Sequence, residues 1–280
     1  MELEVNDMNK IILNIFKVFI ILIIIFNNGL VFANEISNGN NIFRSYLGLS
    51  PNESSFDLRD VIPENVVVRY QGVANNCWAF ATVGALETTL ALKRKKNGQS
   101  VKVFNFSEAH VKYGSRYAMF LNGEKNEKGI DLQKSRGGNF GHVLNYMTNG
   151  FGPVDEKWLK YNENEPDIEL NSIKSITQSA TVMNVVDLSI TNNTDEEEVD
   201  DAISAIKSQI KNYGGVYFEL NYHAGDQYTN TANMARYCDV PLREYESPSH
   251  AVVLIGWDDN YSASNFKKNP GKNGAWIFKN

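Results

Sequence analysis

Gln71-Gly72-Val73-Ala74-Asn75-Asn76-Cys77-Trp78-Ala79-Phe80 is the stretch of sequence that decides the fold. From Cys77 to Leu92 the chain holds no proline and only one glycine, Gly84, while apolar residues recur at helical spacing. Asn76 is a favourable N-cap residue, and the basic run Lys93–Lys96 is typical of the last turn of a helix. We therefore predict a helix that begins at Cys77.

The start of a helix is a special place for a thiol. Unpaired backbone N–H groups and the helix dipole stabilise negative charge there, so the position predicts a lowered pKa and a nucleophilic thiolate at Cys77. Gln71 lies six residues upstream, and its amide together with the Cys77 N–H would form an oxyanion hole. The alternative is a buried structural cysteine beside a core tryptophan.

A second informative stretch runs from Ser249 to Asp258, with His250 at the head of a continuous apolar segment. The pattern predicts a buried strand that places His250 at a sheet end, facing a cleft. Taken alone, His250 would equally be a structural histidine at a strand end. The last six residues, Ala275 to Asn280, form a second apolar segment that ends in Lys279 and Asn280.

Together these segments resemble the papain family of cysteine peptidases. Its signature, Gln-Gly-x-Cys-Gly-Ser-Cys-Trp-Ala-Phe, is matched at Gln71, Gly72 and Cys77–Phe80. Ala74 stands where the family has a disulfide cysteine, so that bridge is absent, and Asn75-Asn76 replace Gly-Ser. The His250 segment resembles the family's His-Ala-Val-x-x-x-Gly-Trp, and the final segment resembles its Trp-x-x-Lys-Asn-Ser-Trp-Gly, interrupted after Asn280.

The resemblance implies an α+β fold of two lobes, one helical around the Cys77 helix and one β-rich, with the active-site cleft between them. It implies a Cys77-His250-Asn280 triad, in which Asn280 orients the imidazole, and needs no metal or cofactor. Gly137 and Gly138 precede a predicted helix, which by itself indicates a turn. In the family a Gly-Gly at this place binds the substrate main chain by strand addition.

The N-terminal region predicts export. Val18–Phe26 is apolar but too short to span a bilayer, and residues 1–33 are typical of a signal peptide cleaved after Ala33, with a retained anchor as the alternative. Residues 34–55 are polar and are interpreted as a linker or short propeptide. Residues 56–280 form the expected peptidase domain, lacking the family's C-terminal strands, and a region beyond Asn280 is a candidate for cell-wall attachment.

Composition limits the remaining possibilities. The chain has 280 residues, 42% of them hydrophobic, which is sufficient for a sizeable core. Its net charge of −6 argues against a nucleic-acid partner. The only two cysteines, Cys77 and Cys238, are 161 residues apart and offer no disulfide framework.

The favoured function is therefore a secreted or cell-surface bacterial cysteine endopeptidase that acts on proteins or peptides through an acyl-enzyme. A catalytically inactive papain-like module for surface adhesion or binding remains an alternative, supported by the three departures after Val73 and by the missing strands. A thiol amidase or transpeptidase acting on the cell wall is a third, because it would share the Cys–His chemistry.

Overall fold

The computed structural model describes residues 21–24, 51–115, 137–148, 150–164, 168, 170–182, 184–187, 196–223, 225–240 and 249–280. Most of the predicted signal peptide and linker therefore lies outside the described residues, as does the stretch 116–136. Within the described part of the chain, no helix is both long and apolar enough to cross a membrane.

The described helices and strands follow one another along the chain with short connections. The helices are α3 (Leu58–Val61), α4 (Cys77–Lys96), α5 (Glu108–Gly114), α6 (Phe140–Thr148), α7 (Leu170–Lys174) and α8 (Glu196–Asn212). The strands are β1 (Ile21–Ile24), β2 (Ser55–Asp57), β3 (Asn184–Asp187), β4 (Val216–Leu220), β5 (Thr229–Asn230), β6 (Ala235–Arg236), β7 (His250–Asp258) and β8 (Ala275–Lys279). Short 3-10 turns lie at Pro63–Asn65, Glu156–Trp158, Asp226–Tyr228 and Ala263–Asn265.

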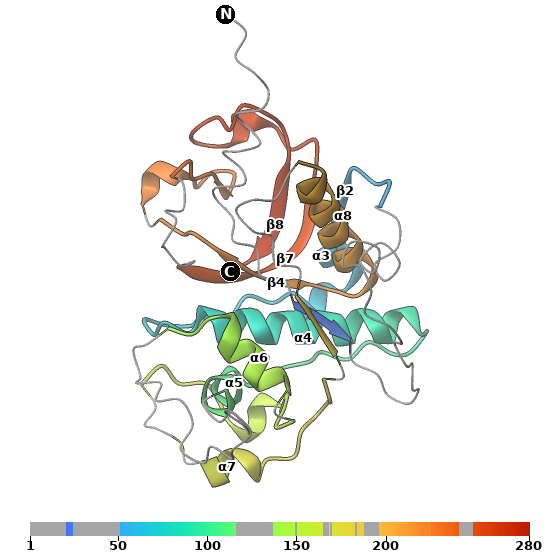
Figure 1. The fold of residues 1–280 in the computed structure, drawn as a ribbon, viewed down its shortest axis with the longest axis vertical. Helices are drawn as coiled ribbons and strands as arrows, with labels where there is room; N and C mark the ends of the chain where they lie inside the picture. Colours follow the sequence, from blue (N-terminus) through green and yellow to red (C-terminus); the bar gives the residue numbers. More distant parts are fainter. Residues whose placement is uncertain are drawn as a thin grey trace, which may run out of the picture.

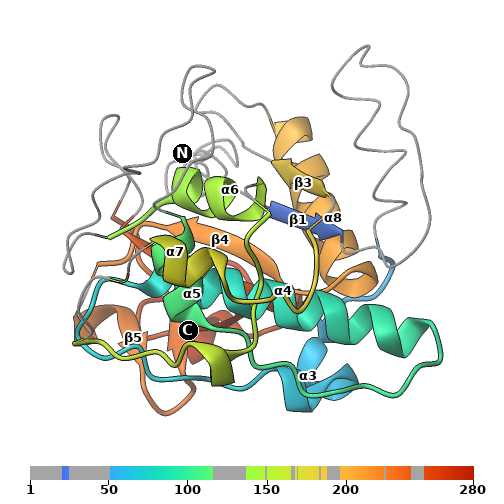
Figure 2. The same ribbon diagram turned by 90° about the horizontal axis from the view of Figure 1, so that it is seen from below.

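Helix α4 is the central element and crosses the molecule between two lobes (Figure 1). Helices α5, α6 and α7 form the lobe on one side, and the main sheet with α8 forms the lobe on the other. Figure 2, seen from the helical lobe, shows these three helices gathered over the first half of α4. Because both lobes cover it, α4 is buried around its whole circumference, whereas its sequence had predicted one broad apolar face. Four polar side chains are buried with its apolar ones: Thr82, Glu87, Thr88 and Thr89.

The strand β7 organises the antiparallel sheet. Strand β4 pairs with its first half, with Leu220 opposite His250, and β2 pairs with its second half. Strand β8 runs along the other side of β7, with Lys279 opposite Val253. This antiparallel register brings the end of β8 back to the start of β7, so Asn280 arrives close to His250. The sheet thus explains how two residues distant in sequence become neighbours.

Three local predictions differ from the structure. Residues 66–68 were expected to be extended, but they belong to no strand, and Val67 and Val68 are exposed. The strand that pairs with β7 is instead β2, where the ring of Phe56 stacks on Trp257 at 5.5 Å. Residues 21–24, at the centre of the apolar N-terminal segment, form β1, which pairs with β3 and β4. Cleavage after Ala33 stays a prediction.

Candidate active site

Cys77 is the first residue of α4, as predicted, and Asn76 is the N-cap. The Asn76 side chain does not cap the helix, however. Its amide donates to the Tyr161 hydroxyl at 2.9 Å, and that hydroxyl donates in turn to the Gln71 carbonyl at 2.7 Å. The family disulfide expected to be absent from this loop is therefore replaced by side-chain hydrogen bonds from the helical lobe. Sequence reasoning missed Tyr161 because it lies 84 residues after Cys77 in an irregular segment.

We expect Tyr161→Phe to weaken the loop that precedes α4. The change removes both hydrogen bonds of the hydroxyl and leaves the buried Asn76 amide without this partner, so the free energy of unfolding should fall by about 1–3 kcal/mol. Urea denaturation would measure it. Tyr70→Phe is the control, because Tyr70 is 82% exposed, and should stay within about 0.5 kcal/mol of wild type. Equal stability of the two variants would contradict this role for Tyr161.

His250 and Asn280 lie together where the sheet faces the start of α4. The His250 Nε2 and the Asn280 Oδ1 are 2.6 Å apart. An amide oxygen only accepts hydrogen bonds, so this contact places a hydrogen on Nε2 and leaves Nδ1 as the basic nitrogen. Cys77, His250, Asn280 and Gln71 all line one cavity of about 430 Å³ between the lobes. The structure thus brings these four predicted site residues together.

The Gln71 side chain lies in this cavity wall, but part of its amide is engaged. Its Nε2 donates to the Ala74 carbonyl at 3.1 Å. One N–H of the amide therefore fixes the loop, and the other remains for a ligand in the cavity. The sequence-based role of Gln71 in an oxyanion hole remains a prediction that this geometry permits.

Both members of the Cys–His pair are disfavoured in their charged forms. Burial raises the pKa of the Cys77 thiol, partly opposed by the backbone N–H groups of Ala251 and Trp78. Burial also lowers the pKa of His250, partly opposed by its hydrogen bond to Asn280. The sequence had predicted a lowered thiol pKa from the helix start alone. That direction is reversed because the cleft removes water from the thiolate, an effect invisible in local sequence.

Glu219 is a further charged residue near the site that the sequence did not reveal. It stands on β4 directly opposite Ala251 and is only 5% exposed. The Tyr217 hydroxyl donates to it at 2.6 Å, and the backbone of Phe140 at the start of α6 also hydrogen-bonds its carboxylate. Its negative charge adds to the rise in the pKa of Cys77. Only the β4–β7 register, which the sequence does not specify, places it there.

We expect Glu219→Gln to lower the pKa of Cys77, because the amide keeps the shape of the side chain and removes its charge. The rate of Cys77 alkylation by iodoacetamide, mapped by mass spectrometry, should therefore rise at a lower pH than in wild type. Glu53→Gln is the matched control, since Glu53 pairs on the surface with Lys211. A Glu219→Gln profile that superimposes on wild type would show that this charge does not reach the thiol.

Gly137 and Gly138 lie immediately before α6, beside the start of α4. A Cβ on Gly138 would lie 2.3 Å from the Trp78 ring, so the absence of a side chain there allows close packing against α4. A Cβ on Gly137 would meet only Asn75, at 3.9 Å. Packing therefore explains Gly138 without a ligand. Their binding of a substrate main chain remains a prediction.

The other histidines lie apart from the Cys77 cavity. His110 is buried between the Tyr146 hydroxyl and the Ile173 carbonyl, and burial lowers its pKa to about 4. His142 contacts Asn139 and the Trp78 ring. Among the described residues, no group of three or more His, Cys, Asp or Glu side chains is placed to hold a metal ion.

A cysteine that begins a helix between two lobes, facing a histidine and an asparagine on the opposite lobe, defines the chain as a two-lobed cysteine-type peptidase. The family follows directly from comparison with known sequences. The chain belongs to the papain family of cysteine proteases, whose model matches residues 52–280. No curated protein sequence matches the chain significantly.

Solved structures agree with this assignment. The clostridial cysteine protease Cwp84 after propeptide cleavage is 25% identical, with a TM-score of 0.60, over 81% of this chain and 50% of that one. The protease and lectin-like domains of Cwp84 from Clostridium difficile give 24% identity and a TM-score of 0.58, over 83% and 46%. SERA5E from Plasmodium falciparum shares 15% identity at a TM-score of 0.50, over 82% and 83%. The chain thus spans about half the length of the Cwp84 chains.

Proposed function

We propose that the chain is an exported cysteine endopeptidase that hydrolyses peptide bonds in proteins through an acyl-enzyme on Cys77. The observation that carries the proposal is the His250–Asn280 hydrogen bond at the cavity that Cys77 also lines. It supports an imidazole held with its basic Nδ1 free for the thiol. The family membership of residues 52–280 supports the reaction class.

The first half-reaction begins with a neutral pair, because burial disfavours both the thiolate and the imidazolium when each stands alone. The Cys77 proton passes to His250 Nδ1, and the sulfur attacks the peptide carbonyl carbon. The Gln71 amide and the Cys77 N–H stabilise the resulting oxyanion. The imidazolium then gives its proton to the leaving amine, so a thioester remains on Cys77 and His250 is neutral again.

The second half-reaction regenerates the enzyme. His250 accepts a proton from water while the oxygen of that water attacks the thioester carbonyl. The same donors hold the second oxyanion, the C–S bond breaks, and the sulfur recovers its proton from His250. A carboxylic acid product leaves. Asn280 orients the imidazole in both halves through the contact at Nε2.

Export to a bacterial surface rests on two supports. The apolar segment before Ala33 is typical of a signal peptide. One similar structure is described as Cwp84, a surface layer associated protein. Proteins or peptides outside the cell would then be the substrates, and attachment to the wall would involve a region beyond Asn280.

The test of the proposal is labelling with a peptide epoxide that reacts with activated thiols, followed by peptide mapping. Both cysteines are free and partly exposed, so Cys238 is an internal control for general thiol reactivity. We expect fast modification of Cys77, slow modification of Cys238, and loss of the Cys77 selectivity in His250→Ala. Equal labelling of both cysteines in the folded chain would contradict an assembled peptidase site and favour an inactive binding module.

A further inference from the structure

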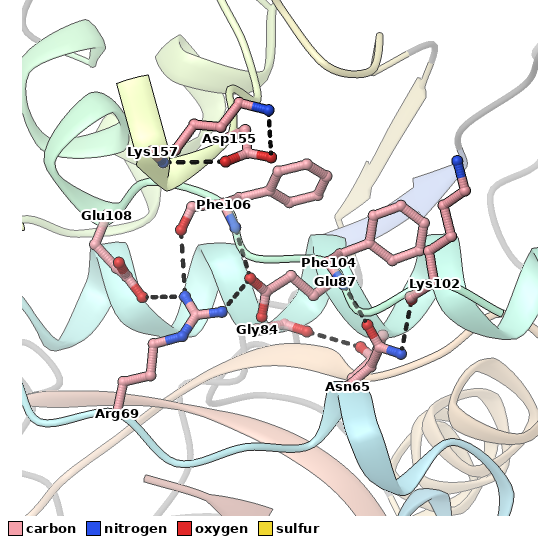
Figure 3. A network of polar contacts seen from close by, with 11 residues as sticks. Asn65, Arg69, Gly84, Glu87, Lys102, Phe104, Phe106, Glu108, Asp155 and Lys157 are labelled. Atoms are coloured by element: carbon pink, nitrogen blue, oxygen red, sulfur yellow. Dashed lines mark hydrogen bonds and ion pairs between the residues drawn. The ribbon is translucent and has the colours of Figure 1, made fainter. Parts of the chain in front are cut away.

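Four charged side chains meet between α4, α5, the segment before the Cys77 helix, and β8. Arg69 pairs with Glu87 of α4 and, at 2.6 Å, with Glu108 of α5, and it also donates to the Phe106 carbonyl at 3.2 Å (Figure 3). Glu87 accepts a further hydrogen bond from the Phe106 N–H at 2.8 Å. Both carboxylates are only 1–2% exposed. Lys279 of β8 interacts electrostatically with these three residues.

Gly84 shows how Lys279 reaches the network. A glycine inside a helix costs about 1 kcal/mol relative to alanine, so its presence in α4 needs a reason from packing. A Cβ at Gly84 would lie 3.2 Å from the Lys279 amine and 2.9 Å from the Val253 side chain. The missing side chain thus leaves room for the Lys279 amine to lie against α4, one helical turn before Glu87.

Each member of the network adjoins a residue of the proposed site in the sequence. Arg69 is two residues before Gln71, Lys279 immediately precedes Asn280, and Glu87 stands on the helix that Cys77 begins. Resting on the proposed function, we propose that Glu87 is a positioning residue for the peptidase reaction. Through Arg69 and Lys279 it holds the oxyanion donor and the histidine orienter in place relative to the nucleophile.

The electrostatics favour positioning over simple stabilisation. Buried ion networks add little net stability, because desolvation of the charges offsets their attraction. Glu87 shows this cost directly: burial raises its pKa to about 7, although Arg69 and Lys279 lower it. A group so costly to ionise is best explained by the geometry that it fixes. That geometry includes three segments, each carrying one residue of the proposed site.

The test compares wild type, Glu87→Gln, Asn280→Ala and the double variant of the full chain. The His250–Asn280 hydrogen bond raises the pKa of His250, so misplacing Asn280 should lower that pKa. We expect Glu87→Gln to shift the His250 pKa downward in an NMR titration, in the same direction as Asn280→Ala. We also expect kcat to fall about ten- to a hundredfold with KM little changed. The double variant should be no worse than Asn280→Ala, because both changes disturb one contact.

Glu108→Gln is the matched control. It removes the other carboxylate partner of Arg69, but from α5, which carries no residue of the proposed site. Its His250 pKa should stay at the wild-type value even if its stability falls. A Glu87→Gln variant with an unchanged His250 pKa, or with losses that multiply those of Asn280→Ala, would overturn the proposal. The titration needs no substrate, so it gives an answer even if Cys77→Ala shows that the chain is not a peptidase.

Discussion

Cys77→Ala should lower kcat/KM for a protein or peptide substrate by about a thousandfold or more, to the level of the reaction without a nucleophile. The sulfur is the atom that forms the acyl-enzyme, and no other thiol or hydroxyl lines the cavity with His250 except the Tyr70 phenol, within the part of the chain that the structure describes. Steady-state hydrolysis of a quenched fluorescent peptide would measure the loss. Circular dichroism would show that the fold remains.

Cys238→Ala is the matched control for this experiment. Cys238 follows β6 and is absent from the residues that line the cavity. Its variant should hydrolyse the peptide at the wild-type rate. If Cys77→Ala hydrolysed as fast as wild type, the activity would come from another group or a contaminant. If wild type were as slow as Cys77→Ala, the inactive binding module would be favoured.

Local sequence predicted the parts of this site that depend on one segment each. The N-cap, the glycine-poor run and the basic end located the helix that starts at Cys77, which the structure confirms. The continuous apolar run likewise located β7, with His250 as its first residue. Such features follow from spacing and end chemistry, which a single sequence contains.

Features that depend on distant pairing were not predicted. Glu219 belongs to an otherwise apolar strand, and only the β4–β7 register places it near Cys77. The rise in the thiol pKa has the same origin, because burial in the cleft follows from how the lobes pack. Arg69 shows the limit most clearly: nothing in its neighbourhood signals that two carboxylates, 18 and 39 residues away, surround it.

Arg69→Met is expected to give the largest loss of stability among single changes to this charge network. Methionine keeps most of the volume but leaves Glu87 and Glu108 buried without the cation that pairs with both. Breaking a buried ion pair from one side costs about 3–5 kcal/mol, because the remaining charge is uncompensated. Urea denaturation at neutral pH would measure it. Arg59→Met is the matched control: the Arg59 side chain is 60% exposed and pairs with Asp57, so its loss should cost about 0.2–1 kcal/mol.

The pH dependence of that loss separates charge from packing. Arg69 lowers the pKa of both carboxylates, so its removal raises their folded-state pKa further above the unfolded value, near 4.5. Groups whose folded pKa is raised lose stability as pH rises through that range. The deficit of Arg69→Met relative to wild type should therefore be small below pH 4.5 and should grow toward neutral pH. Adding Glu87→Gln and Glu108→Gln to Arg69→Met should recover much of the loss at neutral pH. A deficit that is the same at every pH would show that the packing of Arg69, and not its charge, stabilises the fold.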